Sequence, residues 1–199
     1  MKILAIDTSS PRISVAVADS DRVLSKTDEI GSPSVQLISC IEKTLKGAGL
    51  GLRQIDGFVI GEGPGSYNGL RSGFATLHGL LIPRPRRAVK VSSLAAMVSG
   101  VEGPEMRGAI LNARKNSFFF GKFRLENARP KLIEEGMVER IEQISGIDSP
   151  EIAWLSYEVE GFPVAYPDAA ALVRLGRPEL EREPSEKILL EPRYLRPPV

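Results

Sequence analysis

Five glycines, at positions 61, 63, 65, 69 and 73, stand within thirteen residues of this 199-residue chain. They follow an apolar run at 58–60 and lead into a segment whose apolar residues have helical spacing. Glycine brings no side chain to a core, and it loses more conformational entropy on folding than any other residue. The cluster therefore indicates a backbone that turns sharply or lies very close to another group.

The glycine segment has two interpretations. A loop between a strand and a helix can hold an anion on the amides at the helix N-terminus. Alternatively, Gly65, Gly69 and Gly73, spaced four apart, can form a flat helix face against which another helix packs. The known phosphate loops do not fit, because Asn68 replaces the last glycine of G-x-G-x-x-G and no Gly-Lys-Ser/Thr follows.

The composition is that of an ordinary globular protein, with 42% hydrophobic and 26% charged residues. A net charge of +1 gives no support for a broad electrostatic nucleic-acid surface. The single cysteine, Cys40, excludes an intrachain disulfide and indicates a reducing compartment. No segment has the pattern of a signal peptide or a membrane span, so a cytoplasmic location is expected.

Apolar periodicity predicts an α/β fold in which one layout occurs twice. In the first half we expect strands at 3–6, 13–19, 23–27 and 55–60, and helices from Ser32-Pro33 to about 47 and over 70–81. After a Gly/Pro linker at 100–104, the pattern predicts strands at 108–113, 118–124, 131–138 and 152–155, a short helix at 141–144, and a helix from Pro167-Asp168 to Gly176. The predicted subdomains are residues 1–100 and a reduced half, residues 101–199, which ends in a mobile tail.

Asp7 stands at the carboxyl end of the first predicted strand and is followed by Thr8 and Ser9. A carboxylate at this place can hold a metal–phosphate group through water, and small hydroxyls can bind phosphate oxygens. The alternative, which spacing alone favours, is that these three residues cap the strand and its turn.

The chain has few residues of the types that form a catalytic or metal site. His78 is the only histidine, so two histidine ligands cannot come from this chain, and a structural or half-exposed histidine is expected. Cys40 lies among aliphatic residues and is predicted to be a small buried hydrophobe. No serine or cysteine has a plausible base beside it, which gives no support for a peptidase.

Two further clusters have alternative explanations. Arg84, Arg86, Arg87 and Lys90 form a small basic group after the second helix, which we interpret as a solvated loop in preference to an RNA-phosphate contact. The run Phe118–Phe120 is interpreted as sheet core in preference to a platform for stacking bases.

Together, several motifs give the chain a resemblance to the bacterial TsaB (YeaZ) family. They extend over almost the whole chain in the family's order: Ile3–Ser9, Gly63–Gly73, Val91-Ser92-Ser93-Leu94, Leu111-Asn112-Ala113-Arg114 and Glu191–Arg196. The departures include Tyr67-Asn68 for the family's Phe-Thr, Asn112 for its Asp, a first helix that starts Gly31–Gln36, and the unusual Pro83–Arg87.

The resemblance implies an actin/Hsp70-type ATPase fold with two ribonuclease H-like halves. It also implies a non-catalytic subunit in synthesis of the tRNA nucleoside threonylcarbamoyladenosine. The implied partners are a catalytic paralogue (TsaD type), which carries ATP and metal, and a small ATPase subunit (TsaE type). A homodimer is expected in isolation, tRNA is expected to be reached through the complex, and this chain itself is expected to need no cofactor.

In the family, two helices of the first half form the partner and dimer interface, and they match 34–45 and 69–81 here. The resemblance therefore implies these partner-binding residues: Ser34, Ile38, Ile41, Gly65, Tyr67, Asn68, Gly69, Arg71, Ser72, Gly73 and Thr76. Asp7, Thr8 and Ser9 would be a vestige of a nucleotide site. Two alternatives stay open at this point, a small kinase or ATPase that uses Asp7 and a homodimer with another partner.

Overall fold

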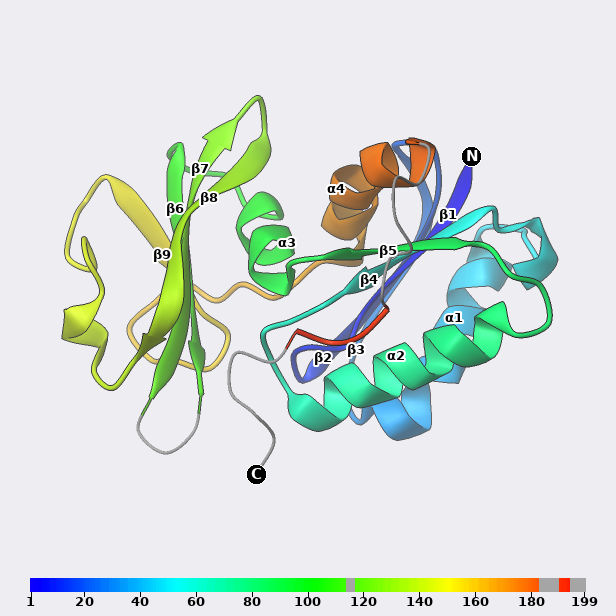
Figure 1. The fold of residues 1–199 in the computed structure, drawn as a ribbon, viewed down its shortest axis with the longest axis horizontal. Coiled ribbons are helices and arrows are strands. Elements are labelled where there is room, and N and C mark those ends of the chain that lie inside the picture. The colour runs from blue at the N-terminus through cyan, green and yellow to red at the C-terminus, as the bar shows by residue number, and fades with distance from the viewer. Residues whose placement is uncertain (114–116, 183–189, 194–199) are drawn as a thin grey trace.

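A mixed five-stranded sheet forms the first lobe of the computed structural model, which describes residues 1–113, 117–182 and 190–193 (Figure 1). The meander of alternating residues becomes three antiparallel strands: β1 (Lys2–Asp7), β2 (Arg12–Asp19) and β3 (Arg22–Ile30). Strands β4 (Gly57–Gly61) and β5 (Arg87–Val91) add in parallel, giving the order β3-β2-β1-β4-β5. β1 lies in the middle, which explains its continuous apolar run.

Helices cover both faces of this sheet, as Figure 1 shows. Helices α1 (Pro33–Gly47) and α2 (Tyr67–Leu81) place Leu37, Phe74 and Leu77 in one core cluster. On the other face, α4 (Ala169–Glu181) packs Leu172 against Ile3 and Val59. A 3-10 turn, η1 (Leu52–Gln54), precedes β4.

The second lobe repeats the layout with one strand fewer. Strands β6 (Met106–Asn112), β7 (Phe118–Glu126) and β8 (Arg129–Val138) form an antiparallel meander, and β9 (Ile152–Leu155) joins β6 in parallel. The order β8-β7-β6-β9 matches the first four positions of the first sheet. Helix α3 (Ser93–Ser99) covers one face, and η2 (Ile141–Gln143) precedes β9. The predicted α/β class with two related halves, the second reduced, is confirmed.

The structure differs from the sequence-based expectation at three elements. Strand β5 and helix α3 were not predicted, and both are short. Helix α4 does not end at Gly176 but continues to Glu181 with Pro178 inside it. Gly176 serves close packing, because a Cβ there would lie 2.6 Å from Val59 Cγ1. Since α4 follows the second sheet but packs on the first, the boundary at residue 100 stays a prediction.

Two arginine side chains fix the linker and the C-terminal stretch. Arg107 is buried at the start of β6, and its guanidinium donates to the carbonyl oxygens of Val98, Val101, Gly103 and Pro104, so it organises the whole linker. The guanidinium of Arg193, near the C-terminus, pairs with Glu135 on β8.

The C-terminal stretch 190–193 is tied to the glycine segment as well. The Arg193 amide donates to the Glu62 carbonyl at 2.8 Å, and Lys90 donates to the Glu191 carbonyl at 3.3 Å. These hydrogen bonds attach Glu191 and Arg193 to the first lobe, and the mobile tail stays a prediction. Residues 183–189 and 194–199, which carry the rest of that prediction, lie outside the described residues.

Candidate functional site

Asp7 ends β1 and is fully buried at the centre of the candidate site. One carboxylate oxygen, Oδ1, accepts hydrogen bonds from the Ser9 amide at 2.9 Å and the Ser9 hydroxyl at 2.7 Å. The other, Oδ2, accepts from the Ser93 hydroxyl at 2.7 Å. The Ser93 oxygen also accepts from the Gly63 amide at 3.1 Å, so Asp7 joins β1, the glycine segment and the start of α3.

Burial raises the pKa of Asp7, outweighing the hydrogen bonds from Ser9 and Ser93 and the charge of Arg12. Gly61 leaves the space for this carboxylate, because a Cβ at Gly61 would overlap Asp7 Oδ2. A carboxyl group that is enclosed by its own chain and accepts hydrogen bonds from Ser9 and Ser93 joins these segments. The geometry thus favours the capping interpretation of Asp7 over a metal–phosphate ligand.

The glycines at 65, 69 and 73 face the end of β1. A Cβ at Gly65 would overlap the Ser9 carbonyl, one at Gly69 the Thr8 carbonyl, and one at Gly73 the Thr8 hydroxyl. The Thr8 hydroxyl donates to the Gly69 carbonyl at 2.9 Å. The small helix face predicted from the four-residue spacing exists, but it packs against Thr8 and Ser9 of the same chain.

The N-terminus of α2 is capped from within as well. The Ser66 hydroxyl accepts from the Gly69 amide at 3.2 Å, and the Ser66 amide donates to the Ser9 carbonyl at 2.6 Å. These bonds occupy the amides of Ser66 and Gly69, which an anion at this helix start could otherwise use. The anion-binding interpretation of the glycine segment therefore has less support than close packing.

Aromatic side chains stack beside the turn that follows Asp7. The rings of Tyr157 and Tyr166 stack with centroids 5.2 Å apart, and the Arg12 guanidinium lies 4.8 Å from the Tyr166 ring centroid. The Tyr157 hydroxyl donates to the Ser9 carbonyl at 3.5 Å, and burial raises the pKa of Tyr157 well above its ordinary value. The turn after Asp7 is thus covered by the chain's own side chains.

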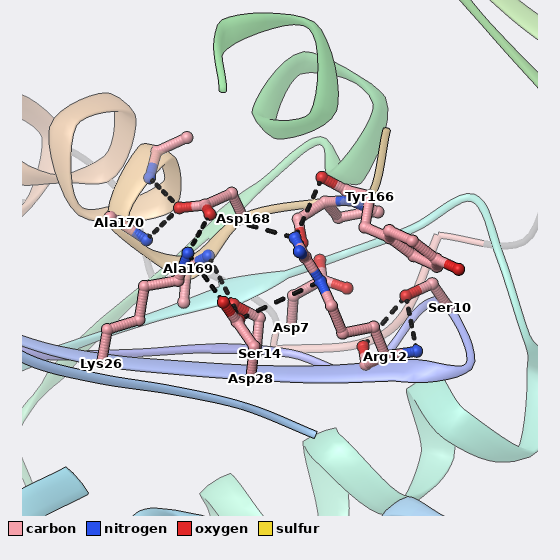
Figure 2. A network of polar contacts seen from close by, with 12 residues as sticks. Asp7, Ser10, Arg12, Ser14, Lys26, Asp28, Tyr166, Asp168, Ala169 and Ala170 are labelled. Atoms are coloured by element: carbon pink, nitrogen blue, oxygen red, sulfur yellow. Dashed lines mark hydrogen bonds and ion pairs between the residues drawn. The ribbon is translucent and has the colours of Figure 1, made fainter. Parts of the chain in front are cut away.

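A charged network continues from this stack to α4 (Figure 2). Lys26 pairs with Asp28 at 2.9 Å and also with Asp168, whose Oδ1 caps α4 by accepting from the Ala170 amide at 2.8 Å. Arg12 donates to the Pro167 carbonyl at 3.0 Å. The network fixes the first turn of α4 on the β1–β3 meander.

Several residues of this site carried no functional prediction. Asp168 was assigned only to a helix start, and Arg12, Tyr157 and Tyr166 were not singled out. Ser93 lies in a motif of the resemblance, and the Ser92-Ser93 pair is a helix-start signal: Ser92 caps α3 by accepting from the Ala95 amide at 3.3 Å. That signal could have placed Ser93 at a helix N-terminus, but not beside Asp7.

The residues with a predicted partner-binding role are divided between surface and core. Ser34, Ile38, Tyr67, Asn68 and Arg71 are exposed. Gly65, Ser72 and Thr76 are half-buried, and Ile41, Gly69 and Gly73 are buried within the chain. The interface itself stays a prediction, but its buried members already have partners in this fold.

The sequence also singled out Cys40, His78 and the run Phe118–Phe120. Cys40 is buried, and burial raises the pKa of its thiol to about 11, so it is an inert thiol as predicted. His78 lies on the exposed side of α2. Phe118 and Phe120 join one core cluster and Phe119 packs against another, which confirms the sheet-core interpretation.

Within the described ranges, no three His, Cys, Asp or Glu side chains come together in a way that could hold a metal ion. No described helix is both long enough and apolar enough to cross a membrane.

Comparison with known proteins agrees with this architecture. A family model described as "TsaD: tRNA N6-adenosine threonylcarbamoyltransferase" matches residues 32–174. The tRNA threonylcarbamoyladenosine biosynthesis protein TsaB of Haemophilus influenzae is 25% identical over 98% of this chain and 94% of its own length. The protein of the same name from Escherichia coli is 27% identical over 73% of this chain and 68% of its own length.

Two solved structures have the same fold along nearly the full length. YeaZ from Pseudomonas aeruginosa superposes with a TM-score of 0.78 at 25% identity, covering 97% of this chain and 99% of that one. A structure described as an uncharacterized protein with similarity to peptidase YEAZ, from the same species, superposes with a TM-score of 0.82 at 24% identity. It covers 98% of this chain and 99% of that one. The chain belongs to the family of that TsaD model, and the resemblance to the TsaB (YeaZ) family is confirmed.

Proposed function

We propose that this chain acts in tRNA threonylcarbamoyladenosine biosynthesis as a non-catalytic subunit that binds and activates the catalytic threonylcarbamoyltransferase subunit. The names of its TsaB relatives support the pathway. One observation supports the non-catalytic role above others. The carboxylate at the end of β1, where this fold could carry nucleotide chemistry, is enclosed by Ser9 and Ser93 and accepts their hydrogen bonds.

The outer side of α1 and the start of α2 provide a plausible surface for the partner. Val35 is 78% exposed and Ile38 51% exposed on α1, and Tyr67 is 40% exposed on α2. The Arg71 guanidinium lies 5.3 Å from the Tyr67 ring centroid, which gives the α2 side a preformed aromatic and charged contact. Apolar side chains with a polar neighbour are typical of a protein interface.

ATP and metal would then be bound by the TsaD-type paralogue, with a small TsaE-type ATPase as a further subunit. This chain would need no cofactor of its own, would form a homodimer through the same helices in isolation, and would reach tRNA through the complex. The alternative, a small kinase or ATPase that uses Asp7, would require opening the Tyr157–Tyr166 stack and releasing Asp7 from both serines.

The test is assembly with the catalytic paralogue, measured as molar mass by size-exclusion light scattering. The wild-type chain is compared with Ile38→Glu, which places a charge in the proposed interface, and with Val164→Glu as a matched control. Val164 is 71% exposed and lies in the second lobe, beyond β9. We expect a defined complex with wild type and Val164→Glu, and its loss with Ile38→Glu. If all three chains assemble alike, the proposed interface is wrong. If none of them assembles with the paralogue, the proposed function is wrong.

A further inference from the structure

The loop between α2 and β5 carries the sequence Pro83-Arg84-Pro85-Arg86-Arg87, which the proposed function does not use. Arg84 donates from Nη1 to the Arg53 carbonyl at 2.9 Å, and Arg86 donates from Nη1 to the Leu52 carbonyl at 2.9 Å. Because Leu52 and Arg53 are consecutive residues of η1, the two guanidiniums are held next to each other. We call Arg84 and Arg86, together with the exposed Arg53 whose backbone carbonyl accepts from Arg84, the arginine cluster.

The charge of the arginine cluster is not cancelled by these bonds, because carbonyl oxygens are neutral acceptors. Among the described residues, none of the three arginines forms an ion pair. Asp56 is the acidic group that acts on Arg86, and one of its oxygens accepts from the Lys2 amide at 2.7 Å. Burial and the charge of Arg84 lower the pKa of Arg86, which is a sign that two cations stand close together.

The cluster is also accessible, and the side chains of Arg84 and Arg86 are anchored. Arg53 and Arg84 are exposed, and Arg86 is half-buried with its guanidinium 5.7 Å from the Phe58 ring centroid. Two prolines restrict the loop backbone around Arg84. The loop lies at the end of the first lobe, on the side away from the second sheet (Figure 1). The neighbouring Arg87 does not belong to the cluster, since its guanidinium donates to carbonyls of Glu179, Leu180 and Arg182 near the end of α4.

We propose that the arginine cluster binds the phosphate backbone of RNA and, resting on the proposed function, of the tRNA that the assembled enzyme modifies. Planar guanidinium forks match phosphate oxygens, and arginines held in place lose little entropy on binding. Neighbouring phosphates along one strand supply the paired negative charges that adjacent guanidiniums require. The site is local, as a chain of net charge +1 requires.

The test is a titration of fluorescently labelled tRNA transcript with the chain, alone and in complex with the catalytic paralogue, at several salt concentrations. We expect Arg53→Gln and Arg84→Gln to weaken tRNA binding roughly three- to tenfold at about 0.1 M salt. Each should also reduce the slope of log K against log salt by about 1. The charge-matched control, Arg129→Gln at the exposed β7–β8 turn, should change neither quantity.

Arg53→Gln is the decisive variant, because no hydrogen bond of its side chain is described and its loss should not disturb the fold. The inference is overturned if both cluster variants bind tRNA with wild-type affinity and slope. It is also overturned if they lose the partner subunit but keep tRNA binding, which would assign the cluster to an acidic protein surface. Light scattering of the same samples shows whether the complex with the paralogue has formed. A loss of tRNA binding by the variants can therefore be told apart from a loss of assembly.

Discussion

Contacts with Thr8 explain why positions 69 and 73 of α2 are glycine. Its hydroxyl donates to the Gly69 carbonyl at 2.9 Å, and its own carbonyl occupies the place that a side chain at Gly69 would need. The same contact continues one turn on, where Gly73 faces the Thr8 hydroxyl. In a close-packed interior even one added methyl group forces its neighbours to move. The end of β1 and the first turns of α2 therefore approach each other only because these positions are glycine.

Two glycines of the same helix should respond in opposite directions when alanine replaces them. Gly69→Ala is expected to destabilise the monomer by about 1–3 kcal/mol, because its Cβ would overlap the Thr8 backbone. Gly79→Ala is expected to stabilise it by about 0.5–1 kcal/mol, since nothing lies within 4 Å of a Cβ there and alanine favours the helix. Urea unfolding of the two variants measures both. If both variants changed the free energy of unfolding equally and in the same direction, the contact with Thr8 would not be what requires glycine at position 69.

At the scale of elements, α4 depends on contacts that are remote in the sequence. Asp168 caps its first turn through the amides of Ala170 and Ala171, at 2.8 and 3.2 Å, and pairs with Lys26 on β3. Burial acts to raise the pKa of Asp168, but the hydrogen bond and charge of Lys26, with the helix amides, bring it below its ordinary value. The first turn of α4 is thus held by an ionised carboxylate.

Replacing Asp168 by asparagine should therefore have a pH-dependent effect. Asparagine keeps a capping oxygen but loses the charge, so we expect a stability loss of roughly 1–3 kcal/mol at about pH 7. Because the folded-state pKa of Asp168 is depressed, the wild-type advantage is present above the ordinary value of 3.8 and is lost as the pH falls through the folded-state pKa. Urea unfolding of the wild type and of Asp168→Asn, from about pH 7 to pH 3, measures this difference in stability. An advantage that is the same throughout would argue against the ion pair.

Local patterns predicted the elements with strong periodicity and missed those without it. The meander β1–β3 and helices α1 and α2 follow from alternation, capping residues and helical spacing. Strand β5 spans 87–91 and comes directly after a Pro/Arg loop, and α3 spans only 93–99, so neither is long enough to show a period. Arg12 and Tyr166 stand 154 residues apart, and no short-range pattern could bring them together.

At the scale of the whole molecule, arginine side chains hold the parts of the chain together. Arg12 bonds to the carbonyls of Tyr166 and Pro167, Arg107 organises the linker, and Arg193 pairs with Glu135. The Tyr157–Tyr166 stack lies beside these contacts, and the Tyr157 hydroxyl reaches the Ser9 carbonyl of the first lobe. A chain held together in this way, with an exposed α1–α2 surface, suits a subunit that acts by binding another protein.

The central claim is that this chain supports the reaction without taking part in its chemistry, and Asp7→Asn tests it most directly. Asparagine can keep an oxygen toward Ser9 and place its amide toward the Ser93 oxygen. The measurement is threonylcarbamoyl transfer to tRNA by the catalytic paralogue, without this chain, with wild type and with Asp7→Asn. We expect the paralogue to depend on this chain, and the variant to restore the rate to within about twofold of wild type. A variant that assembles normally but restores no transfer would show that the Asp7 carboxylate takes part in the reaction, and would contradict the claim.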